Sequence, residues 1–401
     1  MSATKIKLES SSARDPAVVG GGLREHILRL PQDYIGSVGK LTREIWVYEG
    51  GFMTRRLVTY VPGLYKIFDE ILVYAADNKQ RDPSMDSLRV EVNATRCCIS
   101  IYYNGQGLPI ELHPEEGVYV PEMTFGHLSN YEEVRSGVKL ANLFSREFMI
   151  ESVDNRLEKK YKQIFSENMR KMSEPEITVC MKGVNWTRIT FKPDLAKFHM
   201  THLDDDIIAL MKKRVADMAG FLGTTVQVVF NGLMFQPVES FPDYVYSYIR
   251  GATKDRKDPE LESIGERVNE QLEVCVSLSD GAFEQVSYVN KFATTEGGTH
   301  VDFVSNHIAA RLVEFCSKRF KVEEHEVKRH LWVFVNAFVE NPTFDSPTRD
   351  ALTTPQESFG PSCELSDGFL NFGQVNVTSF CPGRQSRDPT LHPVALILWR
   401  L

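Results

Sequence analysis

The segment Val61–Pro83 (VPGLYKIFDEILVYAADNKQRDP) constrains the fold of this chain more than any other part of the sequence. Pro62 stands where a helix can begin, because proline fits the first turn, whose N–H groups have no partner in the helix. Phe68 and Leu72 are four residues apart, and they continue into Ala75 as an apolar stripe that would face a core. The pattern predicts a helix with one buried face.

The same segment places polar side chains together on another face of that helix. Glu70 and Tyr74 are separated by four residues and project in the same direction, and Asp77 and Asn78 follow one turn later. All four can therefore reach one ligand. Spacing alone favours the simpler interpretation, an amphipathic helix with a solvated acidic face.

Composition excludes several classes of protein. The chain has 401 residues, of which 42% are hydrophobic and 25% charged, as in a globular protein long enough for two domains. Its formal net charge of −8 argues against an overall nucleic-acid clamp. DNA contacts would need local patches such as Lys212–Arg214 or Lys318–Arg329, and a solvated helix face is the favoured interpretation of each.

Cysteine and histidine patterns give no metal motif. The cysteines are odd in number and lack CxxC spacing, so they are expected to be reduced, buried thiols of an intracellular protein. They stand at Cys97, Cys98, Cys180, Cys275, Cys316, Cys363 and Cys381. His325 and His330 are five apart and do not form HExxH. No secretory signal or membrane-length apolar run is evident, which predicts a soluble, unexported chain without a membrane partner.

The order of predicted elements indicates an α/β fold. Helices are expected at Leu23–Leu30, Leu64–Asn78, Asp204–Phe221 and Phe303–Arg319. Strands are expected at Leu88–Val92, Cys98–Tyr103, Trp186–Lys192, Thr225–Phe230, Glu273–Leu278, Glu284–Asn290 and Leu331–Phe338. The second of these strands ends in Asn104-Gly105-Gln106-Gly107, a turn that lets a ligand approach the backbone closely, although such turns are more often hairpins.

Several long segments, in this order, resemble the N-terminal part of eukaryotic DNA topoisomerase II, closest to its plant forms. The resemblance covers Leu23 to about Gly373. Its markers are HILRLPQDYIGS (His26–Ser37), VTYVPGLYKIFDEILV (Val58–Val73), YVPEMTFGHL (Tyr119–Leu128), KLANLFS (Lys139–Ser145), WTRITFKPDLAKF (Trp186–Phe198), GGTHVDF (Gly297–Phe303) and HLWVFVNAFVENPTFDS (His330–Ser346). Long matches in one order are more specific than any single motif.

The resemblance implies a two-layer α/β fold and a domain organisation. A polar arm over residues 1–22 would precede a GHKL (Bergerat-fold) ATPase domain over 23–240. A transducer domain of the ribosomal-S5-like type would occupy 241–373, and a divergent tail 374–401. In that family, ATP with Mg²⁺ closes two such regions into a dimeric gate that captures DNA.

Functional positions of the family fall on the first helix and on the strand after it. Glu70 matches the general base that orients the attacking water. The resemblance also implies that Asp77 and Asn78, one turn further along the helix, are ATP-binding positions. Tyr74 stands where the family has a magnesium-binding asparagine, and a neutral phenol is a poor substitute for a hard oxygen ligand. Tyr103 replaces the polar side chain that reads adenine, while Asn104, Gly105 and Gly107 keep the following turn.

The phosphate-binding segments depart further. The stretch Ser129–Leu140 is several residues shorter than the family's serine loop and glycine-rich lid, and only Ser129, Asn130, Gly137 and Lys139 have counterparts. The transducer's Gln-Thr-Lys loop is replaced by Pro347-Thr348-Arg349, in which Arg349 keeps the charge but not the geometry of lysine. We expect the shortened lid to impair phosphate binding more than either tyrosine does.

Two hypotheses from different classes follow. The chain is an ATPase region that still binds and slowly hydrolyses ATP, or it is a non-catalytic module. Such a module would dimerise or bind a partner, or would be a truncated degenerate paralogue with no maintained role. At least three charge-stabilising features are altered, which favours impaired catalysis. The chain ends before any DNA-cleavage domain, so strand passage by this chain alone is not expected. By resemblance the partners would be DNA and a second copy or a full-length relative, and the location nuclear.

Overall fold

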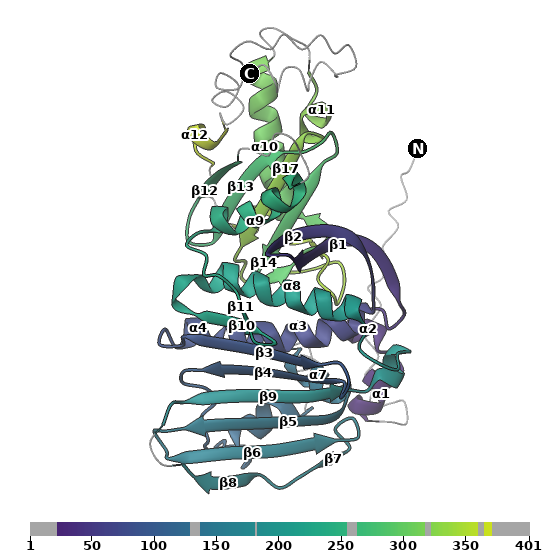
Figure 1. The fold of residues 1–401 in the computed structure, drawn as a ribbon, viewed down its shortest axis with the longest axis vertical. Coiled ribbons are helices and arrows are strands. Elements are labelled where there is room, and N and C mark those ends of the chain that lie inside the picture. The colour runs from purple at the N-terminus through teal and green to yellow at the C-terminus, as the bar shows by residue number, and fades with distance from the viewer. Residues whose placement is uncertain are drawn as a thin grey trace, which may run out of the picture.

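The computed structural model describes residues 22–128, 137–180, 183–254, 263–316, 322–359 and 365–370. A large mixed sheet lies at one end of the described chain and a smaller sheet at the other, with long helices between and beside them (Figure 1). The predicted α/β class is therefore confirmed. No described helix is both long and apolar enough to cross a lipid bilayer.

The element bounds are as follows. The helices are α1 Leu23–Arg29, α2 Gln32–Ile35, α3 Pro62–Ala76, α4 Asn78–Arg81, α5 Val120–Gly126, α7 Val138–Leu143, α8 Asp205–Leu222, α9 Phe241–Thr253, α10 Thr299–Cys316, α11 Glu324–Lys328 and α12 Asp367–Leu370. The strands up to residue 193 are β1 Leu41–Glu49, β2 Phe52–Tyr60, β3 Ser87–Asn93, β4 Cys98–Asn104, β5 Ser145–Asp154, β6 Lys159–Ser166, β7 Lys171–Met172, β8 Glu176–Val179 and β9 Trp186–Pro193. The later strands are β10 Gln227–Phe230, β11 Leu233–Met234, β12 Ser263–Arg267, β13 Leu272–Leu278, β14 Glu284–Val289, β15 Phe292–Ala293, β16 Gly297–Gly298, β17 Leu331–Ala337 and β18 Ala351–Leu352.

Among the described residues, the large sheet follows the order β11-β10-β3-β4-β9-β5-β6-β7, and β8 pairs with β6. Pairing is antiparallel except between β10 and β3. Alternate residues of the central strands are fully buried, so one face of the sheet carries the core. This alternation is the period-2 pattern of a sheet covered on one side.

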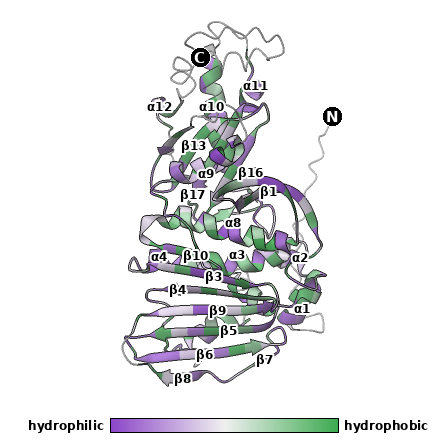
Figure 2. Cartoon of the chain, viewed as in Figure 1, coloured by the Kyte–Doolittle hydropathy of each residue, from purple (hydrophilic) through white to green (hydrophobic). Residues whose placement is uncertain are grey.

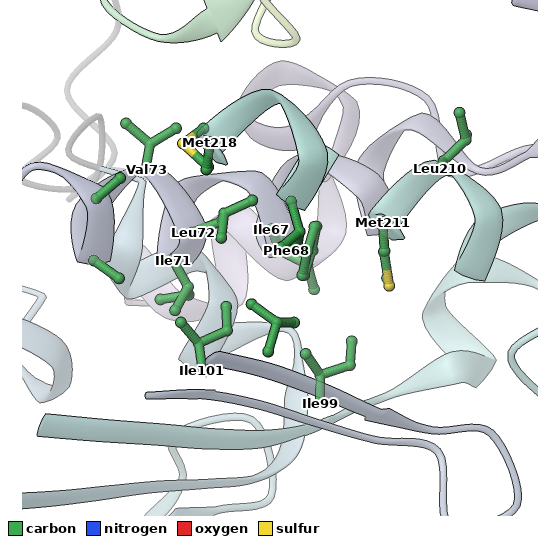
Figure 3. Packing of buried hydrophobic residues seen from close by; sticks show 14 of the residues in the cluster. Ile67, Phe68, Ile71, Leu72, Val73, Ile99, Ile101, Leu210, Met211 and Met218 are labelled. Atoms are coloured by element: carbon green, nitrogen blue, oxygen red, sulfur yellow. The ribbon is translucent and has the colours of Figure 1, made fainter. Parts of the chain in front are cut away.

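Helix α3 lies between the large sheet and α8 (Figure 3). Ile67, Phe68 and Ile71 on α3 lie with Ile101 on β4 and Met218 on α8 in one buried cluster. The apolar stripe predicted from the sequence is confirmed. The predicted solvated acidic face is wrong, because nearly every residue of α3 is buried from all sides. A helix enclosed in this way has no solvent-exposed face.

The smaller sheet has the order β12-β13-β17-β14-β15 and is covered by α10. β17 pairs with β13 antiparallel and with β14 parallel, and its core residues Val333 and Val335 are fully buried. The parallel β16–β18 pair joins the residues just before α10 to the residues that follow the loop 338–350. The hairpin β1–β2 packs on α8 and α9, and Trp46 stacks on Trp332, with 5.5 Å between ring centroids.

Most predicted elements are confirmed in position. α3 ends at Ala76, and a separate turn of helix, α4, follows, so the predicted single helix to Asn78 is two residues too long. β10 begins at Gln227 because residues 223–225 form a short 3-10 helix. The sequence did not reveal the hairpin β1–β2 or the strands β5–β8, whose polar and apolar residues alternate less regularly.

Two expectations from composition need correction. Lys213 and Arg214 are 9% and 0% exposed, so these two residues of the patch Lys212–Arg214 form a buried ionic site, whereas Lys212 is half-buried. Cys97, Cys98 and Cys180 are partly exposed, whereas Cys275 is buried as predicted. Cys363, Cys381 and the side chain of Cys316 lie outside the described part of the chain. Of the Lys318–Arg329 patch, residues 318–321 lie outside the described chain.

Candidate functional site

Glu70 lies at the centre of the candidate site, on the inner side of α3, and is 3% exposed. Its Oε1 atom forms an ion pair with Lys66 Nζ, one turn earlier on the same helix, and a second with Arg349 Nη2 at 3.0 Å. Lys66 is itself 6% exposed, and burial lowers the pKa of its ammonium group. Both cations therefore contact the same carboxylate oxygen of Glu70.

Arg349 reaches Glu70 from the loop that follows β17. Its guanidinium lies 3.7 Å from the centre of the Phe292 ring, on β15, and Lys66 lies over the same ring at 5.4 Å. Arg349 has φ +63°, a left-handed conformation that costs a non-glycine residue about 1–2 kcal/mol. A strained backbone retained at this position indicates that the contact with Glu70 compensates for the strain.

Gly137 closes the other side of Glu70, immediately before α7. Its φ is +76°, and a Cβ atom at this position would overlap the Glu70 carboxylate. The backbone of the shortened lid therefore touches the predicted base directly. Lys139, two residues later, is 6% exposed, and Ser129 and Asn130 lie outside the described residues.

Tyr74 and Tyr103 form a second part of the site. The Tyr74 ring packs edge-on against Phe125 at 5.4 Å, and the Arg81 guanidinium lies 4.9 Å above it. Burial raises the pKa of Tyr74 above its usual value, so its phenol is neutral at pH 7. Burial also raises the pKa of Tyr103, which is 1% exposed and hydrogen-bonds with Thr187 and Tyr74.

The turn after β4 is held by hydrogen bonds within the protein. Asn78 Nδ2 donates to the carbonyl oxygen of Asn104 at 3.1 Å. The Asn104 side chain accepts from the backbone N–H of Ser87 at 2.8 Å. Gly105 has φ +92°, and a side chain at Gly107 would overlap Thr187. These contacts hold the turn in place, and Asn104 and Gly105 line a surface pocket together with Asp82.

Asp77 and Thr348 take part in contacts between distant segments. Asp77, the C-terminal cap of α3, pairs with Lys291 at 2.8 Å, in the turn between β14 and β15. Thr348 hydrogen-bonds with Asp350 and packs against the backbone of Gly36. Among the described residues, the structure thus brings Glu70, Gly137 and Arg349 together, whereas Asn78 contacts the turn after β4.

A buried ionic network joins the same helix to α8 and to the smaller sheet. Arg214 Nε lies 2.8 Å from Asp69 Oδ1, and its other nitrogens contact Asp217 and the backbone oxygen of Lys291. Desolvation acts to lower the pKa of Arg214, but the surrounding carboxylates outweigh it and raise the pKa. Asp217 also accepts hydrogen bonds from Lys213 at 2.9 Å and Tyr244 at 2.6 Å.

Sequence reasoning missed Lys66, Phe292 and Lys291. Lys66 precedes Glu70 by four residues, so helical spacing was sufficient to identify it as a partner. No local signal marks Phe292 or Lys291, because they reach the site from a turn far along the chain. Their role depends on the packing of the smaller sheet against α3.

The fold has close counterparts among solved structures. The ATPase region of Saccharomyces cerevisiae topoisomerase II is 40% identical, with a TM-score of 0.79, and the match covers 87% of this chain and 93% of the yeast one. This chain belongs to the DNA topoisomerase II family. The ATPase and transducer domains of the Balamuthia mandrillaris enzyme match equally well, with 37% identity, a TM-score of 0.78 and coverage of 90% and 94%. The GHKL ATPase and transducer folds are thereby confirmed.

Full-length relatives extend well past the matched region. DNA topoisomerase 2 of Arabidopsis thaliana is 50% identical over 96% of this chain and 29% of its own length. The Pisum sativum protein is 52% identical over 91% of this chain and 26% of its own. The DNA gyrase B family model matches residues 241–372. The chain therefore spans less than a third of the curated topoisomerase II proteins that it resembles.

Proposed function

We propose that this chain is a topoisomerase-II-type ATPase and transducer module whose nucleotide site is closed, and that it acts as a non-catalytic dimerisation or partner-binding module. One observation carries the proposal. The predicted base Glu70 is paired with Lys66 and Arg349, and the backbone of Gly137 packs against it. The space that water and a γ-phosphate would need next to this carboxylate is taken by the protein.

The residues that would hold ATP and Mg²⁺ do not fit those ligands. Magnesium requires hard oxygen ligands in near-octahedral geometry, and Tyr74 offers a neutral phenol covered by Phe125 and Arg81. Adenine recognition needs an exposed polar edge, and Tyr103 is buried against Thr187. Both departures support a site that neither binds nor hydrolyses ATP at the family's level.

The family context supports the choice of partners. A module of this kind would pair with a second copy or with a complete topoisomerase II subunit, near DNA and in the nucleus. The proposed division places the ATPase-like domain at 23–240 and the transducer at 241–373, after an arm over 1–22 and before a tail over 374–401. ATP-dependent control of DNA topology is proposed only for an assembly that contains a complete relative.

A residual ATPase is the second candidate function, and one observation favours it. Glu70 is retained, and Arg349 Nη1 is buried with no hydrogen-bond partner among the described residues, so it could still receive a phosphate oxygen. For that, Arg349 would have to release Glu70. The two functions therefore differ in whether nucleotide can break the ion pair between Arg349 and Glu70.

Repair of the magnesium position alone is expected to fail. We predict that Tyr74→Asn leaves the Mg²⁺-dependent ATPase rate at background, because Gly137 and Arg349 still occupy the space beside Glu70. Each missing charge-stabilising group typically lowers a rate by about 10²–10³. A coupled assay with the ATPase region of the yeast relative as positive control measures this. A Tyr74→Asn rate within about tenfold of that control would overturn the closed-site proposal.

A further inference from the structure

The outer face of the large sheet carries a compact group of basic and aromatic side chains. The paired register places Arg89 on β3 opposite Tyr102 on β4, and Tyr102 opposite Arg188 on β9. Trp186 lies two residues before Arg188 and shares its face. Residues of the opposite face, such as Ile101 and Ile189, are fully buried in the core. The group therefore faces away from the helices that cover the core side.

The rings and cations of this group form one continuous contact. Tyr102 and Trp186 lie 5.9 Å apart with a 34° tilt between ring planes. Arg89 and Arg188 lie 5.6 and 5.5 Å from the Tyr102 centroid. Arg188 lies 5.6 Å from the Trp186 ring, and Lys160 on β6 lies 5.7 Å from it. All four distances are within the range of cation–π attraction. We name these five residues the basic-aromatic face.

The charges of this face are only partly neutralised. Lys160 pairs with Glu151 at 3.5 Å. Arg89 and Arg188 are exposed and form no ion pair with a carboxylate of the described chain. Arg89 Nε donates a hydrogen bond to Ser87 Oγ at 3.1 Å, which leaves its other nitrogens available. Cross-strand pairs of arginine and aromatic rings also stabilise a sheet, but such stabilisation does not require two guanidinium groups without a carboxylate partner. Residues along β3, β9 and β6 alternate between buried and more exposed positions, and hydrophilic residues lie among the hydrophobic ones on these strands in Figure 2.

We infer that the basic-aromatic face binds single-stranded nucleic acid. Two partly buried rings, Tyr102 and Trp186, offer their remaining exposed surface to unpaired bases, and the three cations offer partners to the phosphates between them. Strands in a sheet are spaced about 4.8 Å apart, so the face spans about 19 Å from β3 to β6, enough for a few nucleotides. A duplex keeps its base faces stacked inside and cannot use the rings in this way. The binding does not involve the nucleotide site near Glu70.

The test is fluorescence anisotropy of a labelled 15-nucleotide oligothymidylate titrated with the full chain in 50 mM NaCl. We expect saturable binding, quenching of Trp186 fluorescence, and a salt dependence of log K near −2, as three neutralised phosphates on a single strand give about −0.7 each. Trp186→Ala and Arg188→Ala should each weaken binding by about 5- to 100-fold, the range found for stacking residues.

Two further variants sharpen the result. Glu151→Gln removes the carboxylate that lies opposite Arg188 in the register, and it should tighten binding by about threefold. Arg311→Ala removes a cation from α10, which packs on the smaller sheet and not on the large one, and should leave affinity unchanged. The inference is overturned if oligothymidylate fails to bind at 100 µM protein, or if Trp186→Ala and Arg188→Ala bind as the unmodified chain does. Equal affinity for a duplex of the same length also overturns it.

Discussion

Replacement of Glu70 by alanine will lower the free energy of unfolding of this chain by about 3 kcal/mol, because it leaves Lys66 and Arg349 as buried cations without their shared partner. In a solvent-accessible catalytic site, removal of the base would change activity more than stability. Here the carboxylate is 3% exposed, and the proposed closed site makes it a structural anion. Urea denaturation followed by tryptophan fluorescence measures the difference.

Matched variants separate lost charge from lost volume in this prediction. Glu70→Gln keeps the size of the side chain and one hydrogen bond to Arg349, so its cost should be smaller. Adding Lys66→Met to Glu70→Gln removes the unpaired cation and should recover at least half of the loss. A Glu70→Ala variant within about 0.5 kcal/mol of the unmodified chain would show that Glu70 is solvated, and it would contradict the closed site.

Arg214→Ala should be even more damaging, by about 3–5 kcal/mol. Arg214 is fully buried and contacts Asp69 on α3, Asp217 on α8 and the backbone of Lys291 near the smaller sheet. Its loss leaves two carboxylates short of a cation in a low-dielectric interior, which is among the most costly single changes in a protein.

The neighbouring Lys212 is the control for the Arg214 prediction. It is only half-buried and lies over the Tyr48 ring at 5.6 Å, so Lys212→Ala should cost at most about 0.5–1 kcal/mol. Arg214→Lys keeps a charge without the planar fork, and should fall between the two. Equal stabilities for Arg214→Ala and Lys212→Ala, measured by urea denaturation, would show that the buried network does not stabilise the packing of α3 and α8 next to the smaller sheet.

The sequence predicted the elements whose hydrophobic period is regular. α3, α8, β4, β9 and β17 lie where that pattern indicates, and the family resemblance supplied their arrangement. Charged residues misled the interpretation at Lys213 and Arg214, because a buried ion pair and a solvated helix face have the same local pattern. Asp217 follows these residues on α8 at helical spacing, but the second carboxylate, Asp69, comes from α3, which local spacing does not reveal.

The state of the candidate site depended on contacts between distant segments. The tyrosines at 74 and 103 and the short lid were visible in the sequence as departures from the family. The pairing of Glu70 with Arg349 was not, because it requires the loop after β17 to reach back across Phe292. The basic-aromatic face is likewise a product of strand register, since its residues are scattered from Arg89 to Arg188.

We expect the site beside Glu70 to have no room for a nucleotide. Isothermal titration of the purified chain with a non-hydrolysable ATP analogue and Mg²⁺ tests this directly, with the yeast ATPase region as a positive control. We predict no binding heat up to millimolar nucleotide, which corresponds to a binding free energy weaker than about −4 kcal/mol. A saturable isotherm with a micromolar dissociation constant would contradict the closed site and favour the ATPase.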